Sequence, residues 1–296
     1  MSLLTANNTY NESSNQRLFK VLSVYLNLAP DYIDRSMIEE ITCGDVNSDE
    51  FAFANLAATA CGLDIYENAK DKTFFRSHFL PAFKKLDISP YLKNEYYNNI
   101  KFLNGSLGKW TFETRVCKAY EAFAYDDPQV FADGRIVPCI GFFDDDYPYP
   151  AVLENGREWM TLLPNEINTT QVAIDKSKGK VLTYGLGLGY FTYMSSLKSD
   201  VESVTVVERS RDVIDLFSKY ILPQFQNPQK IHIVESDAFE FAEKYMQSGG
   251  FNTVFTDIWH DPSDGCELYL RMKSYEHLLP DADFVYWIED TLKLYL

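Results

Sequence analysis

One stretch in the carboxyl-terminal half of this chain constrains its fold more than any other. A short apolar run at 181–184 breaks into the turn Gly185-Leu186-Gly187-Leu188-Gly189 and continues into helix-forming residues. Three more β-branched runs follow, each with an acidic residue at or just past its carboxyl end: 204–207 with Glu208, 231–234 with Asp237, and 254–256 with Asp257. Strands that alternate with helices in this way predict a parallel α/β sheet with a ligand crevice at the carboxyl edge of the strands.

The spacing of the glycines narrows the choice of ligand. Dinucleotide sites favour G-x-G-x-x-G, but the third glycine position of that pattern is occupied here by Tyr190. A P-loop is excluded because no G-K-[ST] follows, and a turn without Lys or Arg beside it suits a ligand that lacks phosphates. Glu208 can accept hydrogen bonds from both hydroxyls of a ribose, and Asp237 is placed to accept one from an exocyclic amine.

This combination resembles the class I S-adenosylmethionine-dependent methyltransferases. The resemblance covers about residues 170–290 and implies an α/β fold with a doubly wound, Rossmann-like, mostly parallel sheet. It also implies S-adenosyl-L-methionine as the cofactor, and it assigns these residues to cofactor binding: Gly185, Gly187, Gly189, Glu208, Asp237 and Ala238. Taken singly, Glu208 could instead be an acid that interacts with a helix dipole, and Asp237 could be a helix N-cap.

The segment Thr256–Pro262 is the candidate for the chemistry, because the end of the fourth strand faces the sulfonium side of the crevice in this fold class. Enzymes that methylate the amino groups of bases often have [DN]-P-P-[YFW] here, and this chain lacks those prolines. The segment is more similar to the Asp-x-x-Asp-Pro of the spermidine synthase group. However, the spacing from Asp257 to Asp261 is one residue longer, and the GGGxGG loop of that group is replaced by Gly-Leu-Gly-Leu-Gly.

The candidate catalytic residues of this segment are Asp257, His260 and Asp261. Asp257 or the His260 imidazole could accept the proton of an amine or hydroxyl nucleophile. The resemblance to spermidine synthases implies that Asp261 helps to bind an amine. The alternatives are structural: Asp261 starts the next helix, His260 is solvated, and Trp259 packs in the core instead of making a cation–π contact.

The rest of the chain divides by the periodicity of its apolar residues. Residues 1–94 are predicted to be a helical region, residues 95–168 a small β-rich region, and residues 169–296 the cofactor-binding domain. Glu166 lies in the first turn of a predicted helix, where it either approaches the cofactor's ammonium group or only stabilises the helix start. Little sequence follows the fifth strand, so the usual final hairpin is either absent or replaced by the β-rich region.

Composition bounds the partners and the location. The net charge is −16, from 27 basic and 43 acidic residues, which argues against a nucleic-acid partner and favours a neutral or cationic small molecule, including an amine. Five cysteines, Cys43 among them, are widely spaced without a C-x-x-C pair, which predicts reduced thiols and no metal site. Residues 1–16 lack a signal-peptide pattern, and no apolar run reaches membrane-spanning length. We therefore expect a cytoplasmic protein without a membrane partner, and we leave a homodimer open.

Three functions are consistent with these patterns. The leading hypothesis is an S-adenosylmethionine-dependent methyltransferase that acts on a small molecule. The second is a polyamine aminopropyltransferase of the spermidine synthase kind, which would use the decarboxylated cofactor. The third is a cofactor-binding protein without catalysis, suggested by the short sequence after the fifth strand.

Overall fold

The chain forms two compact units, each assembled from separate stretches of sequence. A computed structural model describes residues 3–42, 48–102 and 104–296. Unit 1 comprises Met1–Ile88 and Val116–Pro148, and unit 2 comprises Ser89–Arg115 and Tyr149–Leu296. The domain boundaries expected from the sequence, after residues 94 and 168, stay predictions. Each unit has its own hydrophobic core.

Unit 1 packs helices against a small sheet. Phe53 stacks on Phe142, with the ring centroids 4.1 Å apart. Asn15 ties the first helix to a hairpin turn, because its side chain donates to the Gly134 carbonyl oxygen (2.9 Å) and accepts from the Ile136 N–H (3.0 Å). The helices are α1 (Leu3–Leu28), α2 (Arg35–Thr42), α3 (Asp49–Ala60), α4 (Ala69–Phe74), the π-helical η1 (Phe75–Phe79) and the 3₁₀ turn η2 (Leu80–Ala82). The strands, in the order β1-β5-β4, are β1 (Phe83–Lys85), β5 (Ile136–Phe142) and β4 (Phe123–Val130).

The helical pattern predicted near the amino terminus is confirmed by α1, in which Leu18, Leu22 and Tyr25 are buried. Among the described residues, no helix is long and apolar enough to cross a bilayer. Cys43 lies outside the described residues, and the other four cysteines are free thiols.

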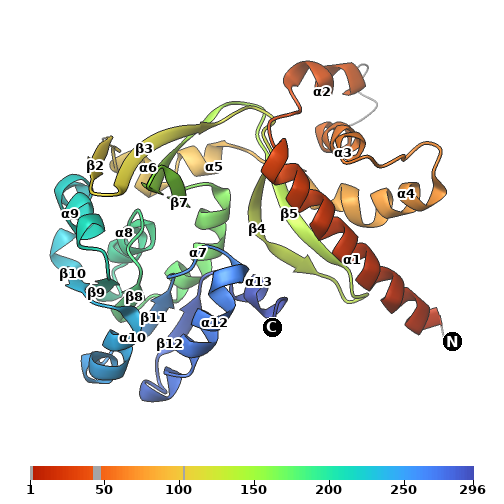
Figure 1. Ribbon diagram of the computed structural model, residues 1–296. Helices are drawn as coiled ribbons and strands as arrows, with labels where there is room; N and C mark the ends of the chain where they lie inside the picture. Colours follow the sequence, from red (N-terminus) through yellow and green to blue (C-terminus); the bar gives the residue numbers. More distant parts are fainter. Residues whose placement is uncertain (1–2, 43–47, 103) are drawn as a thin grey trace. The chain divides into compact units, whose positions relative to one another are not determined.

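Unit 2 is built on a five-stranded sheet in which every neighbouring pair is parallel (Figure 1). The strand order is β10-β9-β8-β11-β12, so the chain starts in the middle, moves outward to one edge, and returns to build the other. In sequence order the strands are β8 (Gly179–Tyr184), β9 (Val201–Glu208), β10 (Ile231–Glu235), β11 (Thr253–Thr256) and β12 (Asp283–Tyr286). This topology confirms the predicted doubly wound, Rossmann-like sheet.

Helices cover both faces of this sheet. Successive residues of a strand point to opposite faces, and Val181 belongs to one core of unit 2 whereas Leu182 belongs to the other. Phe191 and Phe217 come from helices on the first side, and Tyr269 comes from a helix on the second. The helices of this part are α7 (Pro164–Lys176), α8 (Tyr190–Leu197), α9 (Arg211–Tyr220), α10 (Ala238–Phe241), α11 (Gln247–Gly249), α12 (Pro262–Lys273) and α13 (Glu289–Lys293), with shorter turns η3 (Leu222–Gln224), η4 (Pro228–Lys230), η5 (Ala242–Met246) and η6 (Glu276–Leu278).

A second sheet of unit 2 has the order β2-β3-β6-β7. Its last hairpin turns at Asn155 and Gly156, whose φ angles of 52° and 79° are those of a type I′ turn. Because this sheet is separate from the parallel one, the β-rich region does not continue the parallel sheet beyond β12 in the described chain. The remaining elements are α5 (Ser89–Leu92), α6 (Glu95–Asn99), β2 (Gly105–Leu107), β3 (Trp110–Cys117), β6 (Tyr147–Glu154) and β7 (Arg157–Thr161).

Helix α6 secures the glycine turn that joins β8 to α8. Tyr96 is fully buried, and its hydroxyl donates a hydrogen bond to the Leu188 carbonyl oxygen. Asn94, the N-cap of α6, donates to the Tyr190 hydroxyl over 2.9 Å. The turn ends at Gly189, which has φ +76° and caps α8. A Cβ atom there would overlap the buried ring of Phe217.

We expect Gly189→Ala to destabilise unit 2 by more than backbone strain alone. Any non-glycine residue in the left-handed region costs about 1–2 kcal/mol, and forcing the Phe217 ring aside adds roughly 1–3 kcal/mol. The matched control is Gly250→Ala, because Gly250 has φ +62° but no atom within 4 Å of an added Cβ. Equal losses of unfolding free energy for both variants, measured by urea denaturation, would contradict this account.

Candidate active site

The glycine turn lies against the carboxyl ends of three strands, β8, β9 and β11. Gly185 N–H donates to the Val207 carbonyl oxygen of β9 over 2.9 Å, and Asp257 N–H donates to the Tyr184 carbonyl oxygen of β8 over 3.0 Å. Gly185 has φ +94°, and a Cβ atom there would overlap the Asp257 carbonyl oxygen. The turn is therefore free of side chains because the strand ends approach it too closely to admit any.

Glu208 ends β9 beside this turn, as the sequence predicted. Its carboxylate accepts hydrogen bonds from Leu186 N–H (3.2 Å) and Ser210 N–H (2.7 Å). Burial raises the pKa of Glu208, while these two N–H donors oppose the rise. A carboxylate has about four acceptor positions, so both oxygens can still accept from the hydroxyls of a ligand.

Asp237 lies at the neighbouring strand end. Glu208 and Glu235 are paired in the register of β9 and β10, and Ser236 N–H donates to the Glu208 carbonyl oxygen over 3.1 Å. The Asp237 Oδ1 caps α10 by accepting from Phe239 N–H and from the next residue. The capping role considered for this residue is therefore present, and its part in cofactor binding stays a prediction. Ala238 follows as the first residue of α10.

Two more carboxylates approach the turn from other elements. Burial, together with the charge of Glu208, raises the pKa of Asp257 to about 7. Glu166 of α7 is only 6% exposed and accepts one hydrogen bond, from the Thr170 hydroxyl over 3.3 Å. Burial and then the neighbouring Asp257 raise the Glu166 pKa well above its usual value. Glu166 thus lies near Asp257 as well as in the first turn of α7, and its approach to a cofactor's ammonium group stays a prediction.

Met160 of β7 is a contact that sequence reasoning missed. Its thioether sulfur accepts a hydrogen bond from Leu188 N–H over 3.2 Å, and a Cβ atom at Gly187 would overlap the same sulfur. Gly187 has φ +49°. An apolar residue in an alternating strand carries no signal of such a contact, because the contact depends on how the hairpin meets the turn.

The two other candidate catalytic residues lie on the loop after β11. Asp261 is exposed and forms a capping box with Asp264 at the start of α12, where it accepts from Ser263 N–H over 2.7 Å. His260 is exposed, and its Nδ1 lies 3.7 Å from the Asp264 carboxylate. Trp259 is 4% exposed and packs in the core. The structure therefore gives Asp261 and Trp259 the structural roles weighed for them, and their part in catalysis stays a prediction.

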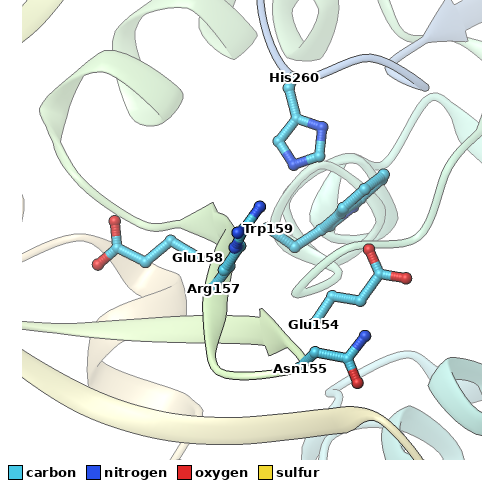
Figure 2. Close-up of a pocket in the computed structure, with 6 residues that line it drawn as sticks. All are labelled: Glu154, Asn155, Arg157, Glu158, Trp159 and His260. Carbon is cyan, nitrogen blue, oxygen red and sulfur yellow. The ribbon is translucent and has the colours of Figure 1, made fainter.

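A hollow of about 570 Å³ opens beside His260 (Figure 2). The His260 ring lies edge-on to the Trp159 ring, with the centroids 3.8 Å apart. Figure 2 shows Arg157 and His260 reaching toward each other, with Glu158 turned away. The lining residues are Glu154, Asn155, Arg157, Glu158, Trp159 and His260. Among the residues that the structure describes, no group of three or more His, Cys, Asp or Glu side chains could hold a metal ion.

The strand order and the crossovers decide the fold of this site. Unit 2 has a doubly wound, Rossmann-like α/β fold. No protein-family model matches the chain, and no curated protein matches it. Part of the chain is similar to solved structures, of which it spans about half the length. The spermidine synthase of Thermotoga maritima aligns over 48% of this chain and 53% of its own, with 19% identity and a TM-score of 0.35.

Two other structures have comparable values. A spermidine synthase in complex with the transition-state analogue AdoDATO aligns over 48% of this chain and 52% of its own, with 16% identity and a TM-score of 0.35. The precorrin 8w decarboxylase of Methanobacterium thermoautotrophicum aligns over 39% of this chain and 57% of its own, with 16% identity and a TM-score of 0.30.

The raised pKa of Asp257 predicts a pH-dependent stability. The folded protein holds this proton up to about pH 7, whereas the ordinary pKa is 3.8. The folded state therefore binds more protons in this window, and the free energy of unfolding should fall as pH rises from about 4 to about 7, by at most about 1.4 kcal/mol per pH unit for one group.

Urea denaturation across this pH range tests the expectation. Asp257→Asn should flatten part of the slope, and Asp281→Asn, which removes an exposed acid, should leave it unchanged. The same slope in wild type and Asp257→Asn would contradict the assigned protonation.

Proposed function

We propose that this protein is an S-adenosylmethionine-dependent methyltransferase that acts on a small molecule. The observation that carries the proposal is that Glu208 ends β9 beside a turn that admits no side chains, and that Asp237 follows the end of β10, the neighbouring strand. Carboxylates at these positions suit the two ends of a nucleoside, with Glu208 accepting from ribose hydroxyls and Asp237 from an amine on the base. No phosphate is needed, and no Lys or Arg stands in the turn.

The residues present also fit the amino-acid part of this cofactor. Leu188 N–H is held by the Met160 thioether, which is a weak acceptor. A carboxylate is a much stronger acceptor, so a ligand carboxylate would replace the sulfur with a gain in free energy. Glu166 would then provide negative charge for an ammonium group, and the ammonium charge would lower the pKa of the Glu166 carboxyl group.

The cofactor, when bound, supplies an electrophilic methyl group on a sulfonium. The chain's own part is to hold the acceptor in line and to take its proton. Asp257 is the candidate base, because a pKa of about 7 leaves a useful fraction ionised at neutral pH while keeping the group basic. His260 is the second candidate, since it lies beside the hollow that would receive the acceptor.

The second candidate function is aminopropyl transfer. Asp257 favours it, because the same base could deprotonate an amine acceptor. The engagement of Asp261 in a capping box argues against it, since that carboxylate is committed to a helix start. A cofactor-binding protein without catalysis remains the third candidate, and the filling of the glycine turn by Met160 supports it.

Calorimetry with S-adenosylhomocysteine tests the cofactor site. Wild type should bind, and Glu208→Gln should weaken binding by roughly 10- to 100-fold, because hydrogen bonds to a charged acceptor contribute about 1.5–3 kcal/mol. Glu202→Gln is the matched control, since Glu202 is an exposed acid near the opposite end of the same strand. Absence of binding by wild type, or equal binding by Glu208→Gln, would reject the assignment.

Decarboxylated S-adenosylmethionine separates the two transfer reactions. We expect S-adenosylmethionine to bind more tightly than the decarboxylated form, because only the former has a carboxylate to replace the Met160 sulfur at Leu188 N–H. The comparison is made by calorimetry with both compounds. The reverse order of affinity would favour aminopropyl transfer and remove the methyltransferase proposal.

A further inference from the structure

The hollow beside His260 differs in charge from the rest of this acidic protein. Both of its glutamates form ion pairs with cations from outside its lining. Lys109 forms an ion pair with Glu154. Arg115 forms one with Glu158 over 2.6 Å and a second with Glu113 over 2.6 Å. The Tyr149 hydroxyl also donates to Glu158. Both acids of the hollow are therefore already engaged by cations.

Arg157 has no such partner. No carboxylate of the described residues forms an ion pair with its guanidinium, although the chain carries 43 acidic residues. In Figure 2 its side chain reaches into the space below His260, while Glu158 points the other way. Arg157 thus places a positive charge without an ion-pair partner in this hollow, in a protein whose net charge is −16.

The lining around Arg157 is held in place. Trp159 lies edge-on to both Trp110 (5.7 Å between centroids) and His260 (3.8 Å), so its ring forms a fixed apolar wall. The hairpin turn is anchored by Asn155 N–H, which donates to the Lys109 carbonyl oxygen over 2.7 Å. A guanidinium offers paired donors that match a carboxylate or phosphate, and an aromatic wall suits a planar body.

The hollow also adjoins the residues assigned to methyl transfer. Met160, next in sequence to Trp159, contacts the glycine turn. His260 stands on the loop that begins at Asp257. An acceptor in the hollow would therefore lie between the β7 hairpin and the loop that carries the candidate base.

We propose that the hollow is the acceptor site, and that it selects small molecules with an anionic oxyacid group, a carboxylate or a phosphate, which pairs with Arg157 while a planar body lies against Trp159. This inference rests on the proposed function and names the substrate class for it. The nucleophile of such a molecule, an amine or a hydroxyl, would face Asp257 and His260.

Fluorine NMR with 5-fluorotryptophan tests the site directly. The Trp159 signal is assigned by its loss in Trp159→Phe, and three probes are titrated: benzoate, phenyl phosphate and benzylamine. We expect one or both anions to shift this signal with saturation, and benzylamine to leave it in place. Arg157→Gln should weaken anion binding at least tenfold, and Arg157→Lys should retain part of it. Benzoate and phenyl phosphate distinguish a carboxylate acceptor from a phosphate one.

Lys244→Gln is the charge-matched control, because it removes one exposed cation that is paired with Glu240 on another element. It should leave anion binding unchanged. Saturable binding of benzylamine without binding of either anion would overturn the proposal. So would anion binding of equal strength in wild type and Arg157→Gln.

A second measurement separates an acceptor site from a cofactor contact. S-adenosylhomocysteine has a carboxylate, and 5′-methylthioadenosine lacks one. If Arg157→Gln weakens binding of the former tenfold but not of the latter, Arg157 holds the cofactor and the proposal is overturned. Unchanged affinity for both supports it. Anion binding that depends on Arg157, in a protein that binds neither nucleoside, would keep the anion site and reject the methyltransferase function alone.

Discussion

The site depends on one steric constraint, the close approach of three strand ends to the turn after β8. Gly185 donates to β9, Asp257 of the β11 end donates back to β8, and a side chain at position 185 would strike the Asp257 carbonyl oxygen. Because the strand ends are that close, the carboxyl groups that follow them gather around one bare stretch of backbone. The position of Glu208 follows from the same constraint, since its side chain accepts from an N–H of the turn.

The carboxyl groups around the glycine turn and the hollow beside His260 differ in their electrostatics. Burial raises the pKa values of three carboxyl groups near the turn, those of Glu166, Glu208 and Asp257, and neighbouring carboxylates raise the first and the last further. This region therefore favours a positively charged ligand group or bound protons. The hollow beside His260 has its glutamates paired and its arginine unpaired. A cofactor with a cationic group at the turn and an acceptor with an anionic group in the hollow would together match the charges of both regions.

Much of the parallel sheet could be predicted from the sequence, because its signals are local. The strands are short β-branched runs, and the turn needs glycine at positions with positive φ. Glu208 and Asp237 could be placed because the carboxyl ends of parallel strands meet at one edge. Asp261 could be interpreted in two ways, and only the geometry of the capping box with Asp264 reveals its structural engagement.

The contacts that complete the site could not be predicted, because they join distant parts of the chain. Met160 reaches Leu188 only once the β7 hairpin has met the turn. The absence of an ion pair at Arg157 also depends on distant residues, since Lys109 and Arg115 are the cations that pair with Glu154 and Glu158 of the same hollow. No local pattern in the sequence predicts which cations form these ion pairs.

The division of unit 2 into separate stretches has a consequence for synthesis on the ribosome. Residues 89–115 emerge long before the sheet on which they pack. The Tyr96 hydroxyl can donate to its acceptor, the Leu188 carbonyl oxygen, only after 92 more residues have been synthesised. Until then the aromatic surface of α6 is exposed in the nascent polypeptide and is open to chaperones.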